Sequence, residues 1–375
     1  MPIAELVRRV CFVVLAAAGV SYFVVEAIVA AAWPTGQHEP STSTWQDEVM
    51  SWLVTGGAGY IGAHIVRALA DAGLSPVVLD DLSSGHAGFV PDGVPFVRGS
   101  ILDSGVVEGT LRQYDVEGVI HVAGFKYAGV SVQRPLHTYR QNVEGTRVVL
   151  EAMDAVGVTN LVFSSSAAVY GTPDVPLVTE DLPKRPASPY GESKLIGEWL
   201  IADQGVATAS TKHPLRHTSL RYFNVVGSGD VAVYDTSPHN LFPIVFEKLI
   251  AGETPRINGD DYDTPDGTNV RDYVHVADIA AAHVVAAQRL AAGESVEPAY
   301  NLGSQNGLSV KEIMDAMARV TGIDFTPEIG PRRAGDPDRI VATGELAARD
   351  LDWQMRYTVD EMVRTGWEAR RAAQV

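Results

Sequence analysis

Two side chains four residues apart, Tyr190 and Lys194, have the types and the spacing of a proton-transferring pair. The run that contains them is predicted to be helical as far as residue 204, so both side chains share one helix face. A phenol with a pKa near ~10 is a poor base at neutral pH, but a nearby ammonium and a bound cation favour its ionised form. Ser166, at the end of a predicted strand, can hydrogen-bond the same substrate hydroxyl. Alone, a Tyr-x-x-x-Lys pair is more often a surface pair, so its meaning depends on the rest of the chain.

A glycine-rich turn between a predicted strand and a predicted helix supplies that context. Residues 52–55 form an apolar run typical of a buried strand, residues 64–72 have helical spacing, and glycines stand at 56, 57, 59 and 62. Such a turn lets backbone approach a diphosphate, and the next helix points its N–H groups at the phosphates. A second apolar strand, 76–79, ends in Asp80, where a dinucleotide-binding fold places the acid that holds the adenosine ribose. That acid repels a 2′-phosphate, and no arginine lies close behind it. We therefore predict NAD rather than NADP.

Strands and helices must alternate along the chain to bring these groups together. Apolar runs predict further strands at 95–98, 118–122 and 161–163, and helical spacing covers 104–114 and 143–156. This order predicts an α/β fold, a Rossmann-like doubly wound parallel sheet with right-handed crossovers. Ligands of such sheets bind at the carboxyl ends of the strands, and Asp80, Lys126 and Ser166 all lie at or just past such ends.

Three regions are expected along the chain. Residues 50–224 are predicted to form the NAD-binding domain, and residues 225–375 mainly a smaller C-terminal α/β part that binds substrate. A helix at 276–290 is expected to pack on the NAD-binding domain. Residues 1–49 are an N-terminal extension.

The extension contains a mostly apolar run, 10–33, whose length suits a membrane span. Arginines before the run and acids after it favour export of everything downstream, which would separate an NAD-binding domain from its cofactor. We therefore favour Met50 as the functional start over a membrane anchor, and we expect a cytoplasmic protein. Membrane association is expected only if the extension is real.

Composition bounds the class of protein. The chain has 375 residues, of which 46% are hydrophobic and 20% charged, so a packed core is expected. A net charge of −17 argues against a nucleic-acid surface. Cys11 is the single cysteine, which excludes a disulfide within the chain. The ten histidines show no ligand spacing, and no metal site is predicted.

From Met50 onward the chain resembles the UDP-glucose 4-epimerases of the extended short-chain dehydrogenase/reductase family. The matching runs occur in family order and cover nearly all of this part. They are Thr-Gly-Gly-Ala-Gly-Tyr-Ile-Gly at 55–62, His-Val-Ala-Gly-Phe-Lys at 121–126, Ser-Ser-Ser-Ala-Ala-Val-Tyr-Gly at 164–171, Tyr-Gly-Glu-Ser-Lys at 190–194, Arg-Tyr-Phe-Asn at 221–224, Val-Arg-Asp-Tyr-Val-His-Val at 270–276 and Pro-Arg-Arg-Ala-Gly-Asp at 331–336.

The resemblance implies roles for residues at the matching positions. The catalytic residues are Ser166, Tyr190 and Lys194. The NAD contacts are Gly56, Gly59, Tyr60, Ile61, Gly62, Asp80, Asp81, Ser100, Ile101, Val122, Ala123, Gly124, Lys126, Asn142, Tyr190, Lys194 and Phe223. The substrate contacts are Lys126, Ser166, Tyr190, Asn224, Asn240, Leu241, Arg256, Asn258, Arg271, Arg333 and Asp336. Arginines also suit a diphosphate as charge-assisted donors, although surface charge is their commoner role. Ser100 departs from the family, which usually has an acid there.

The implied reaction is the interconversion of UDP-glucose and UDP-galactose by a homodimer with tightly bound NAD. Tyr190 removes the proton of the sugar 4-hydroxyl with help from Ser166, and C4 passes a hydride to NAD and takes it back on its other face. Lys194 binds the nicotinamide ribose and keeps the pKa of Tyr190 low.

Three rival functions of the same fold are less well matched by the residues. A 4,6-dehydratase would need an acid and a base just after Ser166, where Ala167 and Ala168 stand. A decarboxylase would need a further basic contact for a sugar C6 carboxylate, and the sequence does not identify one. A non-catalytic NAD-sensing protein usually lacks the tyrosine or the lysine, and both are present here.

Overall fold

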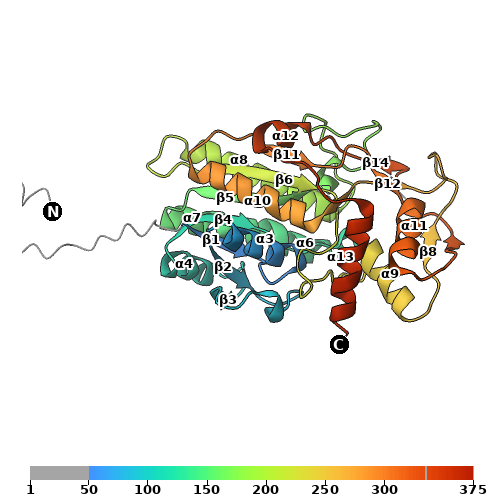
Figure 1. Cartoon of the computed structure of the whole chain (residues 1–375). Coiled ribbons are helices and arrows are strands. Elements are labelled where there is room, and N and C mark those ends of the chain that lie inside the picture. The colour runs from blue at the N-terminus through green and yellow to red at the C-terminus, as the bar shows by residue number, and fades with distance from the viewer. Residues whose placement is uncertain (1–49, 334–335, 375) are drawn as a thin grey trace, which may run out of the picture. The chain divides into compact units, whose positions relative to one another are not determined.

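The computed structural model describes residues 50–333 and 336–374. The interpretation of residues 1–49 falls outside this range. A seven-stranded sheet forms the centre, with every neighbouring pair of strands parallel (Figure 1). Its strands, in spatial order, are β11 (Ala299–Leu302), β6 (Arg216–Tyr222), β5 (Asn160–Ser166), β4 (Val116–His121), β1 (Ser51–Thr55), β2 (Ser75–Asp80) and β3 (Phe96–Arg98). The predicted Rossmann-like fold is confirmed.

Helices cover both faces of this sheet, and each face has its own apolar core. On one face α3 (Tyr60–Asp71) and α10 (Val276–Ala291) pack together with α12 (Glu345–Leu351). On the other face lie α4 (Ser104–Gln113), α7 (Gly145–Val156) and α8 (Pro189–Thr208). The strands between them are almost completely buried, which is why they read as continuous apolar runs in the sequence.

A second group of short elements packs beyond the carboxyl ends of the strands around a separate apolar core. Its helices are α9 (Leu241–Ile250), α11 (Val310–Thr321) and α13 (Val359–Ala372). Its strands pair as β7 (Asn224–Val226) with β10 (Tyr273–His275), as β8 (Arg256–Asn258) with β13 (Glu328–Gly330), and as β12 (Leu308–Ser309) with β9 (Val270–Arg271) and β14 (Arg339–Ile340).

Three short helical segments connect β4 to α7: α5 (Ala128–Gln133), α6 (Pro135–Tyr139) and a π-helical turn, η2 (Arg140–Glu144). A 3-10 turn, η3 (Ala167–Tyr170), follows β5 directly, and another, η1 (Ala87–Phe89), follows β2.

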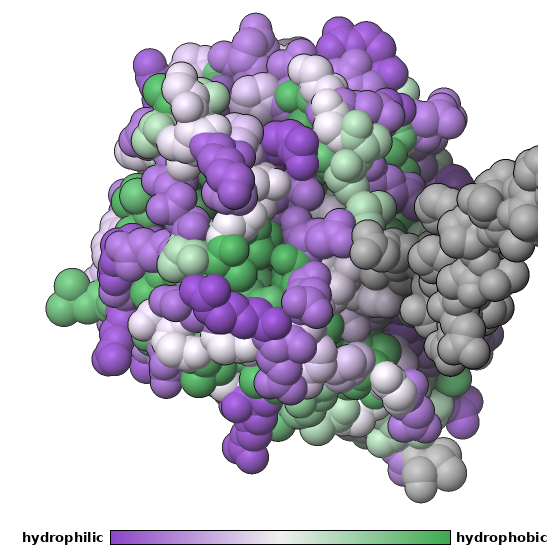
Figure 2. Space-filling view, turned by 90° about the vertical axis from the view of Figure 1, so that its left-hand side faces the viewer, coloured by the Kyte–Doolittle hydropathy of each residue, from purple (hydrophilic) through white to green (hydrophobic). Residues whose placement is uncertain are grey.

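Hydrophilic residues cover most of the face shown in Figure 2, and hydrophobic residues show between them, including near its centre. Across residues 50–333 and 336–374, no helix combines the length and the apolar character that a membrane span requires.

Candidate active site

One cavity of about 1080 Å³ opens where the carboxyl ends of the central strands meet the smaller part of the chain. Ser166, Tyr190 and Lys194 all line it, although 24 residues separate the serine from the tyrosine in sequence. The rule that ligand sites of parallel sheets form at this edge therefore holds for the three predicted catalytic residues.

Helix α8 presents Tyr190 and Lys194 because its start is well defined. Ser188 caps the helix by accepting a hydrogen bond from the Gly191 N–H at 3.2 Å, and Pro189 occupies the first turn. The Lys194 ammonium donates to the Ser164 carbonyl of β5 at 2.8 Å. This bond joins α8 to the strand that carries Ser166.

Burial is the largest influence on the pKa values of Tyr190 and Lys194. Burial raises the pKa of Tyr190, and a hydrogen bond with Ser166 lowers it. Burial lowers the pKa of Lys194 to about 8, against the raising effect of Glu198. The expected lowering of the tyrosine pKa by Lys194 is therefore not the dominant effect in the protein alone. Desolvation disfavours the charged form of both groups, and a further positive charge is needed to favour the phenolate.

The glycine turn after β1 has the shape of a phosphate cradle. Gly56 has φ 74°, and a Cβ on Gly62 would lie 2.1 Å from the Gly56 carbonyl oxygen, so only glycine allows this close packing. Helix α3 starts after Gly59 without a side-chain cap, so its first N–H groups are available to a ligand. At the end of β2, Asp80 accepts hydrogen bonds from two backbone N–H groups, at 3.0 and 2.8 Å. These features fit a dinucleotide.

The predicted contacts gather around the same cavity with two exceptions. Its lining includes Gly56, Gly59, Tyr60, Ile61, Gly62, Asp80, Asp81, Ile101, Val122, Ala123, Gly124, Lys126, Phe223, Asn224, Asn240, Leu241, Arg256, Asn258, Arg271, Arg333 and Asp336. Ser100 and Asn142 are not in this lining. The Ser100 hydroxyl accepts a hydrogen bond from the Leu102 N–H at 3.2 Å, within its own turn.

Asn142 supports the cavity wall from behind. It lies in the π-helical turn η2, is buried, and holds the Phe125 backbone with its oxygen at 2.6 Å and its nitrogen at 3.0 Å. Its nitrogen also donates to Ser193 on α8 at 2.8 Å. Asn142 thus supports the loop that carries Lys126, and its contact with NAD stays a prediction.

The opposite end of the cavity holds positively charged side chains. Arg271 forms an ion pair with Asp336 at 2.5 Å. Both residues were predicted to bind the substrate. Arg256 and Arg333 line the same region. Guanidinium groups here have the donor geometry that a diphosphate requires.

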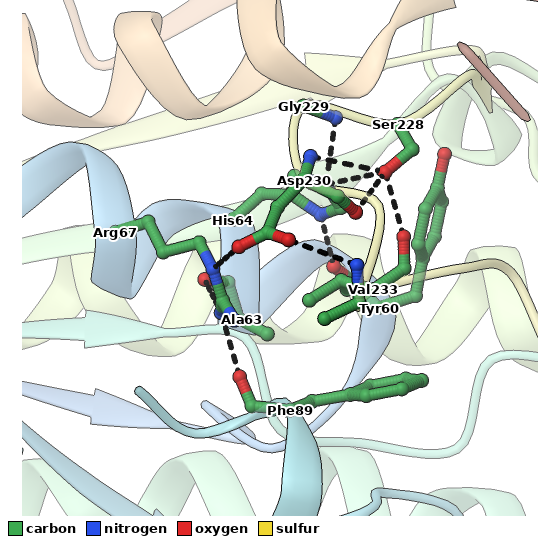
Figure 3. A network of polar contacts seen from close by, with 10 residues as sticks. Tyr60, Ala63, His64, Arg67, Phe89, Ser228, Gly229, Asp230 and Val233 are labelled. Atoms are coloured by element: carbon green, nitrogen blue, oxygen red, sulfur yellow. Dashed lines mark hydrogen bonds and ion pairs between the residues drawn. The ribbon is translucent and has the colours of Figure 1, made fainter. Parts of the chain in front are cut away.

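The loop of residues 227–240, of which the sequence analysis singled out only Asn240, contributes a wall of the cavity. Figure 3 shows how α3 anchors it. The Tyr60 hydroxyl donates to the Gly227 carbonyl at 2.6 Å, Arg67 pairs with Asp230 at 2.5 Å, and the Gly229 N–H donates to His64 at 2.9 Å. The helix whose N-terminus faces the cofactor region thus also fixes a wall of the cavity.

A second missed residue, Glu198, stands one turn beyond Lys194 on α8. Its carboxylate accepts hydrogen bonds from Ser165 at 2.5 Å and from Arg221 of β6 at 2.9 and 2.6 Å. Arg221 also donates to the Tyr170 hydroxyl at 2.8 Å. Glu198 lies four residues after Lys194, so helical spacing alone would have placed it on the same face of the helix as Tyr190 and Lys194.

Comparisons with known proteins agree with this geometry. The sequence pattern of the NAD dependent epimerase/dehydratase family matches residues 52–303. A UDP-glucose 4-epimerase from Lactobacillus helveticus is 40% identical over 324 residues, which cover 85% of this chain and 96% of that protein. The crystal structure of UDP-glucose 4-epimerase from Brucella ovis in complex with NAD has a TM-score of 0.80 at 39% identity, covering 85% of this chain and 97% of the other.

A third relative was solved with NAD+ and UDP bound. The crystal structure of UDP-glucose 4-epimerase from Bifidobacterium longum in complex with NAD+ and UDP has a TM-score of 0.78 at 33% identity, covering 87% of this chain and 99% of the other. With the glycine turn, the acid after β2 and the strand-end serine in place, the chain belongs to the NAD dependent epimerase/dehydratase family, alongside the UDP-glucose 4-epimerases.

Proposed function

We propose that this chain interconverts UDP-glucose and UDP-galactose at sugar C4. The observation that carries the proposal is the presence of Ser166, Tyr190 and Lys194 in one cavity with the glycine turn and the arginine-lined end. The positions after Ser166, where a dehydratase would need an acid and a base, are Ala167 and Ala168 at the start of η3.

Tyr190 acts as the base for the sugar 4-hydroxyl in this proposal. Ser166 lowers the pKa of Tyr190 through hydrogen bonding, and its hydroxyl can hold the same sugar hydroxyl, which favours proton transfer along a short path. Lys194 is fixed by the Ser164 carbonyl and faces the cavity as the neighbouring cation. Arg271 and Arg333 bind the UDP diphosphate, so the sugar itself is held less firmly and can turn.

The glycine turn, the α3 N-terminus and Asp80 hold NAD in this proposal. When bound, NAD accepts a hydride from C4 reversibly, and its nicotinamide cation favours the phenolate of Tyr190. The reaction has no net redox change, so NAD should stay bound between turnovers.

We also propose that the chain acts as a cytoplasmic homodimer. Apolar side chains on α8 and the adjoining α6 face outward: Trp199 is 57% exposed, Val206 79% and Leu136 83%. Helices α6 and α8 pack together, so these side chains belong to neighbouring elements. A second copy of the same helices is the partner that the family resemblance implies.

Replacing Tyr190 with Phe tests the catalytic assignment. The variant loses the proton acceptor but keeps the ring, so conversion of UDP-galactose should fall by at least about a thousandfold while NAD released on denaturation stays equal to that of the wild type. Undiminished conversion in this variant would remove Tyr190 from the mechanism.

A further inference from the structure

Asp235 is a carboxylate in the cavity that the proposed reaction does not use. It lies in the loop between β7 and α9 and lines the same cavity as Ser166. Its oxygens accept hydrogen bonds from the Asn240 side-chain amide at 2.7 Å and from the Ser237 N–H at 2.9 Å. The carboxylate is therefore held in position before a ligand binds.

The Asp235 carboxylate influences tyrosines on two different parts of the cavity lining. Burial raises the pKa of Tyr60 on α3 and that of Tyr127 after β4, and in both cases the Asp235 carboxylate raises it further. Burial also raises the pKa of Asp235, and the Lys126 ammonium lowers it. In the part of the chain that the structure describes, no ion pair includes Asp235. Asp235 thus lies close enough to Tyr60, a predicted NAD contact, and to Lys126, a predicted contact of both ligands, to influence them electrostatically.

The ligands of this cavity limit what such a charge can contact. Both NAD and a UDP-sugar carry diphosphates, which a carboxylate repels. The diphosphates have their own partners in the α3 N-terminus at one end and in Arg271 and Arg333 at the other. A carboxylate accepts hydrogen bonds and donates none, so Asp235 fits a neutral hydrogen-bond donor of a bound ligand, such as a hydroxyl of the sugar.

We propose that Asp235 makes the site selective for nucleotide-sugars with an uncharged sugar and rejects sugars that carry a carboxylate at C6. The proposal rests on the proposed function, which places the sugar in this cavity. C6 is two bonds from the reacting C4, and in this proposal its substituent lies beside Asp235. Two carboxylates repel each other strongly in a partly desolvated cavity, whereas a C6 hydroxymethyl group donates a hydrogen bond to Asp235.

The test compares binding of two probes that differ only at C6, UDP-glucose and UDP-glucuronic acid. The full-length protein with its retained NAD is titrated calorimetrically with each probe. Asp235→Asn removes the charge and keeps an acceptor, so UDP-glucuronic acid should bind about tenfold more tightly than to the wild type, equal to about 1.4 kcal/mol. Affinity for UDP-glucose should change by less than about threefold. Asp315→Asn, which removes an equal charge from an exposed position on α11, should leave both affinities unchanged.

Each other outcome counts against the proposal. An unchanged ratio of the two affinities in Asp235→Asn refutes the selectivity role. A parallel loss of affinity for UDP alone, which has no sugar, would show that Asp235 only supports Asn240, and would also overturn it. Conversion of UDP-galactose by the wild type tests the proposed function separately, because a wild type that converts its substrate can still have an inert Asp235. A protein that binds neither probe refutes both.

Discussion

Replacing Glu198 with Gln should destabilise the protein strongly, because it breaks a buried ion pair that joins α8 to β6. The side chains of Glu198 and Arg221 are 9% and 6% exposed, and two hydrogen bonds connect them. Removing one partner leaves a buried charge without compensation, which costs about 3–5 kcal/mol of the unfolding free energy. With an unfolding entropy of ~2.1 cal/mol/K for each of about 320 residues, the melting temperature should fall by about 4–7 °C.

Differential scanning calorimetry and urea unfolding of the wild type and the variant measure this loss. Glu368→Gln is the matched control, since it breaks the Arg364–Glu368 pair of α13, in which both side chains are about half exposed. A surface pair of this kind contributes ~0.3–0.5 kcal/mol. If Glu198→Gln costs no more than Glu368→Gln, the buried pair does not hold α8 against β6, and the reasoning is wrong.

Three further predictions concern the glycine turn, the buried Lys194 and the exposed face of α8. Gly62→Ala places a Cβ 2.1 Å from the Gly56 carbonyl oxygen, which distorts the glycine turn. The purified variant should therefore retain less than about a tenth of the wild-type NAD, measured by absorbance after denaturation. Full retention of NAD would contradict the assignment of this turn as the phosphate-binding site. Burial lowers the pKa of Lys194 from 10.5 to about 8, so between these pH values the unfolded chain binds more protons than the folded chain. The unfolding free energy of the wild type relative to Lys194→Met should therefore rise across this window, by up to about 3 kcal/mol, and a pH-independent difference in urea unfolding would count against it. Trp199→Glu puts a charge on the exposed face of α8 and should shift the protein from dimer to monomer in sedimentation; an unchanged mass would exclude this face as the interface.

The central strands were predictable because they are buried on both faces. Runs such as 52–55 and 76–79 contain almost only apolar residues, and β1 and β2 agree with them within a residue at each end. β6 was not predicted, because its residues 216–222 include Arg221 and other polar groups. Arg221 is buried by virtue of Glu198, a partner 23 residues away that no local pattern of hydrophobicity reveals.

The candidate site was predictable where a motif fixes the backbone and harder to predict where only a tertiary contact does. The glycine turn and the Tyr190–Lys194 spacing point to the cavity directly. Asn142 instead lies in a π-helical turn and bonds to the Phe125 backbone, and sequence spacing indicates neither feature. Asp235 belongs to an irregular loop whose position depends on anchoring to α3, so its place in the cavity could not be read from sequence periodicity. The roles assigned to the individual residues stay predictions.

The direct test of the account is the conversion of UDP-galactose by the purified protein without added NAD. We predict that UDP-glucose forms until the two sugars reach equilibrium, because the cavity retains its NAD and the reaction consumes none. Absence of UDP-glucose, even after NAD is supplied, would contradict the proposed epimerase function.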